Sequence, residues 1–208
     1  MQVRGLRLLT ILLLSIFIGT IPGQASDENF SLGFSLEDEG LQGFHLSVGE
    51  YFRIPRKEVL RVRDRIHDED ELAVIFFIAK HAHVKPTEIV KLRQQGHSWR
   101  DISLRYRINP DAYYYAVPRG YYIGPYGHAY GHLKHDHKNW KDTRLNDRDI
   151  VNLVNLRYIT EHHGYPPDRI MKMRSEGRSF VCIQRELLSG NGTEKQSPSD
   201  TENRYRTE

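Results

Sequence analysis

The chain has few of the features that commit a sequence to cross-links, to a membrane or to nucleic acid. It has a single cysteine, Cys182, so no disulfide can form within the chain. Its main apolar run, residues 8–21, is shorter than the roughly 20 residues that a membrane-spanning helix needs. The formal net charge is +3. A charge so close to neutral argues against a general nucleic-acid-binding surface.

Sequence motifs that carry well-known chemistry are also missing. The chain contains no glycine-rich phosphate loop, no G-x-S-x-G, no H-E-x-x-H and no C-x-x-C. Each of these motifs places a nucleophile, a metal ligand or a phosphate-binding backbone at a fixed spacing. Their absence leads us to predict that the protein is not an enzyme.

The N-terminal segment, 1–25, resembles a secretory signal peptide in its composition. Arg4 and Arg7 precede the apolar run, and Gly23 and Ala25 supply the small residues of a cleavage site. We expect cleavage near Ala25, a periplasmic or secreted protein of the bacterial envelope, and no stable membrane insertion afterwards. The alternative is an uncleaved membrane anchor.

The mature chain carries an internal repeat at a fixed offset. The segment 72–106 aligns with 153–187 without a gap, and ten of 35 positions are identical. Self-similarity at a fixed offset is the signature of duplicated supersecondary units. A fainter echo aligns 54–72 with 84–102. We therefore expect a first helical unit at 54–110 and a second at 149–188.

Each unit carries signals for three helices. Asp68 and Asp149 are matched candidates for the residue that caps the first helix. In the first unit, Pro86 suits the start of the next helix and Gly96 its end, and Ser98 then caps a third helix. The fold class predicted is mainly α, with a duplicated, helix-turn-helix-like three-helix unit.

The segment 92–106, LRQQGHSWRDISLRY, resembles the helix-turn-helix segments of bacterial regulators. The resemblance implies DNA binding as an alternative function. However, a recognition helix presents polar residues to base edges, and the later copy has Phe180, Val181, Cys182 and Ile183 there. Together with the export signal, this departure leads us to expect no nucleic-acid partner.

The ends of the mature chain differ in character from the repeats. Apolar residues alternate over 29–36 and again over 44–48, which predicts a short β-hairpin within 26–53. The tail, 189–208, has almost no apolar residues to bury, so we expect it to be disordered.

A segment rich in Tyr, Gly and His, 111–148, separates the two units. It holds seven of the twelve tyrosines and four histidines, His128, His132, His135 and His137. If 127–138 were helical, three of these imidazoles would share a face and could bind Zn, Cu or Ni. The other interpretation is an exposed insert that packs its rings over the helical units.

These patterns predict an exported, non-catalytic helical-repeat protein that binds an envelope protein or peptide. The binding surface would be the aromatic insert and the adjacent helix faces, because exposed tyrosines give large, rigid contacts at low entropic cost. The alternative is a periplasmic protein that binds a transition metal through the histidines of the insert.

Overall fold

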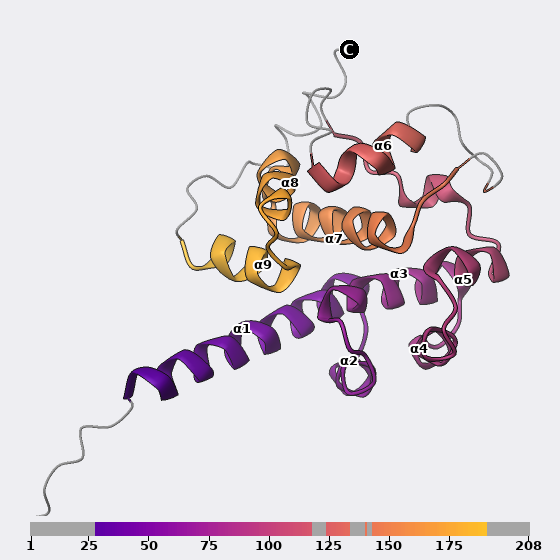
Figure 1. Cartoon of the computed structure of the whole chain (residues 1–208). Helices are drawn as coiled ribbons and strands as arrows, with labels where there is room; N and C mark the ends of the chain where they lie inside the picture. Colours follow the sequence, from indigo (N-terminus) through magenta and orange to yellow (C-terminus); the bar gives the residue numbers. More distant parts are fainter. Residues whose placement is uncertain (1–27, 118–123, 134–139, 141–142, 191–208) are drawn as a thin grey trace, which may run out of the picture.

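The structure is a computed structural model, and it describes residues 28–117, 124–133, 140 and 143–190, with side chains from residue 39 onwards. Its described residues are mainly α-helical, as predicted (Figure 1). Among the described helices, none is long and apolar enough to cross a membrane. The predicted signal peptide and the tail beyond residue 190 lie outside the described residues.

The N-terminal element is a long helix, α1 (Glu28–Phe52), where a β-hairpin is predicted. The hairpin prediction is wrong for its second strand, 44–48, which lies inside this helix. Phe44, Val48 and Phe52 are buried and recur every four residues, which is close to the helical period. Over a segment as short as 44–48, a repeat of four residues also fits the alternation of a strand. The sequence pattern there does not distinguish a helix from a strand.

Six helices occupy the two segments that align in the sequence. They are α3 (Leu72–Ala82), α4 (Pro86–Gln94) and α5 (Trp99–Arg105), followed later by α7 (Asp147–His163), α8 (Pro167–Ser175) and α9 (Phe180–Leu188). Helices α4 and α8 begin and end at residues that the alignment matches. Helices α5 and α9 also begin at matched residues. Gly96 and Gly177 both have a positive φ, at 86° and 89°, in the turns between them. We call 68–106 the first repeat and 149–187 the second.

The start signals of the two repeats are not equivalent in the structure. Asp68 is a cap, as predicted, but of a 3₁₀ helix, η1 (Glu69–Glu71), and it accepts a hydrogen bond from the Asp70 N–H at 3.0 Å. Asp149 is not a cap: Asn146 caps α7, and Asp149 is the reciprocal member of that capping box. The central helix of the second repeat therefore starts earlier than its sequence signal predicts.

An extra helix, α2 (Arg56–Arg63), precedes the first repeat. It buries Val59 and Val62, whereas α4 buries Ile89 and Leu92 at the positions that the fainter echo matches. Gly49 allows α1 to approach α2 closely, because a Cβ there would lie 2.5 Å from Val59 Cγ2.

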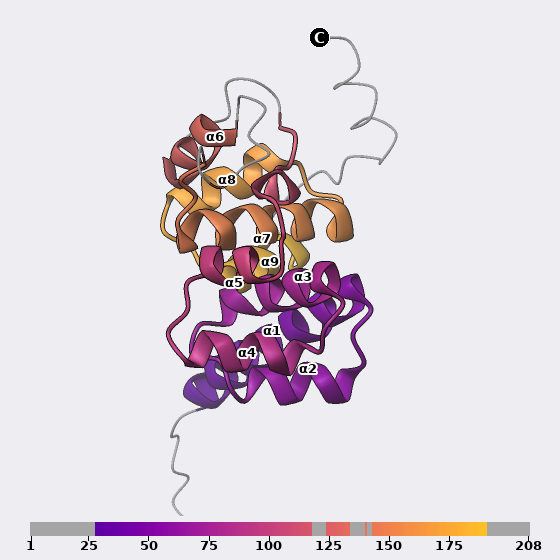
Figure 2. The same ribbon diagram turned by 90° about the vertical axis from the view of Figure 1, so that its right-hand side faces the viewer.

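The core is centred on α3 and α7, which pack on each other (Figure 2). Every residue of α3 from Leu72 to Ala79 is buried, so this helix is covered on all sides. Figure 2 shows α2 to α5 in one half of the molecule and α6 to α9 in the other, with α3 and α7 where the halves meet. The two repeats therefore form one continuous core.

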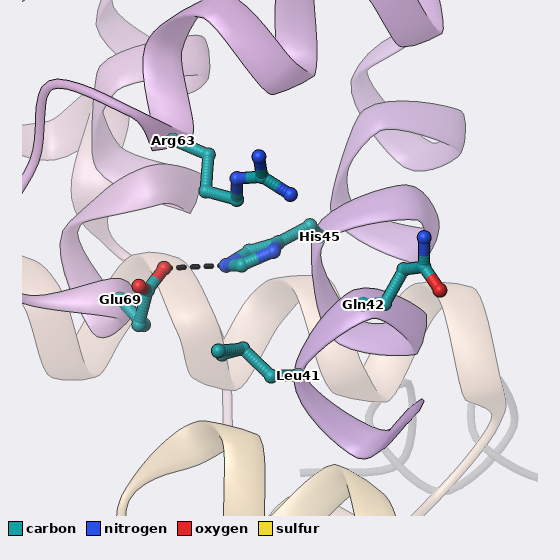
Figure 3. Close-up of a pocket in the computed structure, with 5 residues that line it drawn as sticks. All are labelled: Leu41, Gln42, His45, Arg63 and Glu69. Atoms are coloured by element: carbon teal, nitrogen blue, oxygen red, sulfur yellow. Dashed lines mark hydrogen bonds and ion pairs between the residues drawn. The ribbon is translucent and has the colours of Figure 1, made fainter. Parts of the chain in front are cut away.

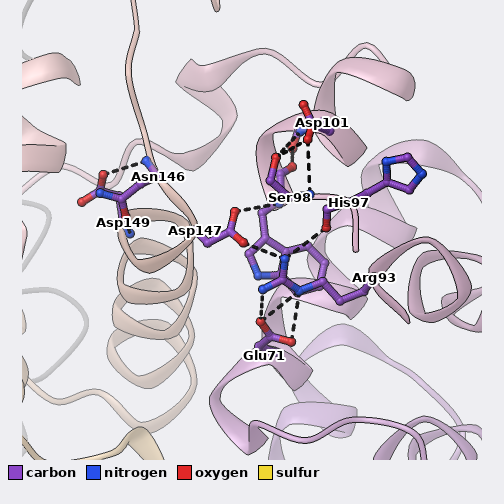
Figure 4. Close-up of polar contacts among 10 residues, drawn as sticks. Glu71, Arg93, His97, Ser98, Asp101, Asn146, Asp147 and Asp149 are labelled. Atoms are coloured by element: carbon purple, nitrogen blue, oxygen red, sulfur yellow. Dashed lines mark hydrogen bonds and ion pairs between the residues drawn. The ribbon is translucent and has the colours of Figure 1, made fainter. Parts of the chain in front are cut away.

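Two arginines join the halves in the same way, and Figure 4 shows the first of them, Arg93. Arg93 of α4 contacts Glu71 in its own repeat at 2.5 Å and Asp147 of α7 at 2.6 Å. Asp147 also accepts the Trp99 N–H at the start of α5, at 2.8 Å. A carboxylate of the second half therefore caps a helix of the first.

The reverse contact is made by Arg174, the residue that matches Arg93 in the second repeat. Arg174 donates to Asn152 and to Asp70, both at 3.0 Å, and Asp70 accepts the Phe180 N–H at 2.8 Å. Arg93 and Arg174 also lie over the rings of the residues that begin α5 and α9, each 4.6 Å from the ring centroid. Each half thus supplies the acid that caps the last helix of the other.

Several aromatic residues in the described part of the insert are built into the core. The described elements of the insert are η2 (Pro110–Tyr113), η3 (Gly124–Tyr126) and α6 (Gly127–Leu133). Tyr113, Tyr126 and Tyr130 are almost fully buried, and Trp140 is also buried. These rings therefore pack over the helical units, as one interpretation of the insert predicts. The prediction that the tyrosines of the insert are exposed for binding is wrong for Tyr113, Tyr126 and Tyr130.

Candidate functional site

A small pocket lies where the start of the insert meets three helices. We call it the Tyr114 pocket. Its volume is about 260 Å³. The lining side chains are mostly aromatic or charged, and they are Tyr51, Phe52, Phe77, Lys80, His81, Tyr114, Tyr115, Arg157 and Glu161, with Ala116 beside them. Tyr114 is 39% exposed, one of three large apolar side chains that are exposed in the described part of the chain.

Arg157 of α7 fixes the insert at this pocket. Its Nη1 donates to the Ala112 carbonyl at 3.0 Å, and its Nη2 donates to the Tyr114 carbonyl. The guanidinium lies 5.6 Å from the Phe77 ring centroid and 5.8 Å from that of Tyr115. One side chain therefore holds both the backbone and a ring of the insert in place.

The opposite wall is held by a hydrogen bond between α1 and α7. The Tyr51 hydroxyl donates to the Glu161 carboxylate. Burial, the Glu161 hydrogen bond and the charge of Glu161 all raise the pKa of Tyr51 well above its ordinary value. Tyr51 therefore stays a neutral donor at physiological pH, and this hydroxyl does not change charge there.

The predicted metal ligands are brought together in part. His128 and His132 lie one turn apart on α6, with ring centroids 4.6 Å apart, so the predicted helix is observed as far as Leu133. His128 Nδ1 lies 2.7 Å from a carboxylate oxygen of Asp149. His135 and His137 lie outside the described residues. Within the described ranges, no three His, Cys, Asp or Glu side chains are grouped as a metal site would require.

A second, more polar pocket lies between α1, α2 and η1, and sequence reasoning did not find it (Figure 3). It has a volume of about 430 Å³ and is lined by Leu41, Gln42, His45, Arg63 and Glu69. His45 is 1% exposed. Its Nε2 contacts the Glu69 carboxylate, and its Nδ1 is buried without a hydrogen-bond partner among the described residues. The lining therefore combines a guanidinium and an amide with a buried imidazole that is paired with a carboxylate.

A polar cluster joins α1, α7 and α9. The Tyr158 hydroxyl lies 2.8 Å from Ser47 Oγ and also contacts Gln184, while Ser47 Oγ lies 3.1 Å from His163 Nε2. A serine next to an imidazole at this distance is a geometry that nucleophilic catalysis uses. Here, however, the same hydroxyl is engaged by the buried Tyr158. We interpret the cluster as a clamp between three helices.

The helix starts that would have to contact DNA are engaged inside the molecule. In helix-turn-helix proteins the N-terminal residues of the second helix contact base edges. Here the first N–H of α5 bonds to Asp147 and that of α9 bonds to Asp70. Trp99 and Phe180, the residues at these starts, are fully buried.

Comparisons with known proteins give no external guide to this arrangement. No protein-family model, no curated protein and no solved structure matches the chain. The function must therefore be inferred from the site itself.

Proposed function

We propose that the protein is a non-catalytic helical-repeat protein of the bacterial envelope that binds a protein or peptide partner through the Tyr114 pocket. The observation that carries this proposal is a small pocket with aromatic walls on a fixed frame, with Tyr114 exposed at its edge. Tyrosine and arginine are enriched at protein interfaces, above all at the residues that contribute most to binding.

The size of the pocket favours one inserted side chain over a whole small molecule. Pockets for small molecules usually measure about 300–1,000 Å³, and this one is about 260 Å³. Its rim combines Lys80 and Arg157 with Glu161, so it suits an apolar or aromatic anchor with polar neighbours. The duplicated three-helix unit, at 54–110 and 149–188, serves in this proposal as the rigid scaffold for that pocket.

Selection of binding peptides tests the proposal. Random peptides displayed on phage would be selected on the mature protein and then measured against Tyr114→Ala and Leu188→Ala. Leu188 is 51% exposed at the end of α9, so it is a matched loss of exposed apolar surface elsewhere. We expect Tyr114→Ala to weaken binding by roughly tenfold and Leu188→Ala to leave it unchanged. Equal affinity for all three proteins would contradict the proposal.

The second candidate function is transition-metal binding by the insert. It is favoured by the pairing of His128 and His132 on one face of α6, with His135 and His137 following in the sequence. Titration with Zn, Cu or Ni would compare the wild type with a variant in which all four histidines are alanine. Stoichiometric binding that the variant loses would support a metal site, whereas no binding by either protein would remove it.

A further inference from the structure

A hollow in the first repeat has no occupant among the described residues, and its counterpart in the second repeat is filled by the chain itself. The hollow measures about 570 Å³ and lies between α4 and the turn that precedes η1. The lining residues that matter here are Asp68, Glu71, Val90, Arg93 and Gln94. It shares no residue with the Tyr114 pocket. Figure 4 shows Glu71 and Arg93, which meet at its edge.

The alignment of the two repeats identifies the counterpart surface. Asp149, Asn152, Met171, Arg174 and Ser175 occupy the positions that match the five lining residues. Asn152 is bonded to Arg174 as Glu71 is to Arg93. The two surfaces therefore have the same frame, in which an arginine of α4 or α8 is held by matched residues earlier in its own repeat.

In the second repeat, residues 124–128 cover this surface. A Cβ built on Gly124, where φ is +56°, would lie 2.6 Å from Ser175 Cβ, so the backbone of the segment rests directly on α8. Tyr126 is fully buried, and η3, the element that ends at Tyr126, packs on α8. His128 Nδ1 contacts Asp149 at 2.7 Å. The backbone at Gly124 and the imidazole of His128 thus each meet a residue whose equivalent lines the open hollow, and the buried Tyr126 lies between them in the sequence.

The charge around the open hollow indicates the kind of partner. Arg65 lines this hollow and also a neighbouring one of about 560 Å³, which Lys85 lines as well. Three acids line these two hollows, and each is already engaged: Glu58 pairs with Arg61, Glu71 pairs with Arg93, and the Asp68 carboxylate accepts the Asp70 N–H. In the described part of the chain, neither Arg65 nor Lys85 forms a salt bridge. The surface therefore favours a partner with acidic residues beside the inserted ring.

We propose that the hollow beside Arg93 binds a short segment of a partner protein, in which an aromatic side chain enters as Tyr126 does in the second repeat and acidic residues flank it. The site is additional to the Tyr114 pocket and does not depend on it. The backbone of the segment rests on α4 near Gln94, its ring lies toward Val90, and its acidic flank lies toward Arg65 and Lys85.

The chain itself supplies the probe for this proposal. A synthetic peptide with the sequence of residues 124–133 would be titrated into ¹⁵N-labelled mature protein, where the equivalent surface of the second repeat is already covered. We expect shifts in the amide signals of residues 65–68 and 90–94. NMR titration detects binding even with a dissociation constant of about 1 mM. Replacing the tyrosine of the peptide that matches Tyr126 by alanine should weaken binding by roughly tenfold.

Two protein variants test the charge preference. A peptide with glutamates added at both ends should bind more tightly, and Arg65→Glu should remove that gain, a change of at least about threefold. Lys91→Glu is the matched control, since it makes the same charge change at an exposed position on α4 that does not line the hollow.

Three results would overturn the proposal. They are the absence of any shift, shifts confined to residues 146–152 and 171–175, and equal loss of affinity in Arg65→Glu and Lys91→Glu. A concentration-dependent dimer that Arg65→Glu abolishes would also overturn it, because the occupant would then be a second copy of the chain.

Discussion

Buried tyrosines of the insert differ in what their hydroxyls contact, and the difference is measurable. The Tyr113 hydroxyl is hydrogen-bonded to Ser103 Oγ at 2.6 Å. The Tyr126 hydroxyl is buried and has no hydrogen-bond partner among the described residues. A buried polar group without a partner costs free energy, whereas a satisfied one contributes modestly.

Replacing each of these tyrosines by phenylalanine should therefore have different effects. Tyr113→Phe should lower the free energy of unfolding by about 1 kcal/mol, because Ser103 loses a partner. Tyr126→Phe should leave the stability unchanged or raise it. Urea denaturation of both variants measures the difference, and each variant serves as the control for the other. A larger loss for Tyr126→Phe than for Tyr113→Phe would contradict this view.

Arg157 holds the start of the insert through two hydrogen bonds to its backbone. Arg157→Lys keeps the charge but loses the planar group that donates to two carbonyls at once. We expect a loss of about 2 kcal/mol of stability and weaker peptide binding at the Tyr114 pocket. Chemical denaturation of Arg157→Lys and of Arg148→Lys provides the measurement. Arg148 is an exposed arginine on the same helix, so a similar loss in both variants would show that the carbonyl contacts do not matter.

At the scale of single elements, the repeat predicts matched helix starts with one difference. Ser98 caps α5 and Ser179 caps α9, and each accepts the N–H of the residue three positions on, at 3.0 and 3.2 Å. In the first repeat the Asp101 carboxylate accepts the Ser98 N–H in return, which completes a capping box. In the second repeat the equivalent residue is Cys182, which lacks a carboxylate.

Ser98→Ala and Ser179→Ala should each reduce stability by about 1 kcal/mol. The Ser98 hydrogen bonds lower the pKa of Asp101 below 3.8. A carboxyl whose pKa is lowered on folding stabilises the protein fully above its unfolded pKa, and the effect is lost as pH falls through the folded pKa. The loss caused by Ser98→Ala should therefore shrink below about pH 4, and the loss caused by Ser179→Ala should not. Denaturation at about pH 3 and about pH 7 measures both, and a parallel response would contradict the assignment.

At the scale of the whole molecule, the two halves stabilise each other. Because α3 is buried along its whole apolar length and α7 forms one of its sides, neither half buries its central helix alone. We expect the chain without residues 1–25 to unfold in a single transition. A fragment of residues 28–117 should show no cooperative thermal transition by near-ultraviolet circular dichroism. Independent unfolding of that fragment would show that the halves are separate domains.

The contribution of Asp70, which joins the two halves through Arg174, to the stability of the protein should depend on pH. Burial raises the pKa of Asp70 above 3.8, against the opposing effect of Arg174. A carboxyl whose pKa is raised on folding binds its proton more tightly in the native state, so its contribution to stability falls as pH rises from the unfolded to the folded pKa. The stability of the wild type relative to Asp70→Asn should therefore decrease as pH rises above about 4. Urea denaturation of both proteins across this range measures the difference, and a relative stability that increases would contradict the direction.

Much of the helical arrangement could be predicted from local signals. Pro86 and Pro167, Gly96 and Gly177, and Ser98 and Ser179 mark helix starts and turns because their backbone preferences act over a short stretch of chain. The second strand of the predicted hairpin, 44–48, is helical instead, because a brief alternation also fits a helix that buries every fourth position. The positions of the insert tyrosines could not be predicted, since burial depends on which surface the segment meets.

The candidate sites were predicted to a smaller extent. The aromatic character of the insert that contains Tyr114, and the spacing of His128 and His132, could be seen in the sequence. The contribution of Arg157, the pocket around His45 and the open hollow beside Arg93 could not, because each joins residues from elements that are distant in the chain.

The sequence by itself determined the helices of the two repeats and their order, since capping, turn conformation and apolar spacing are local properties of the chain. The tertiary structure alone decided that Asp147 caps a helix of the first repeat and Asp70 one of the second. It also decided that residues 124–128 cover one of two matching surfaces and leave the other open. Those outcomes depend on how two similar halves pack, and packing is set by the shape and charge of whole surfaces rather than by any short stretch of residues.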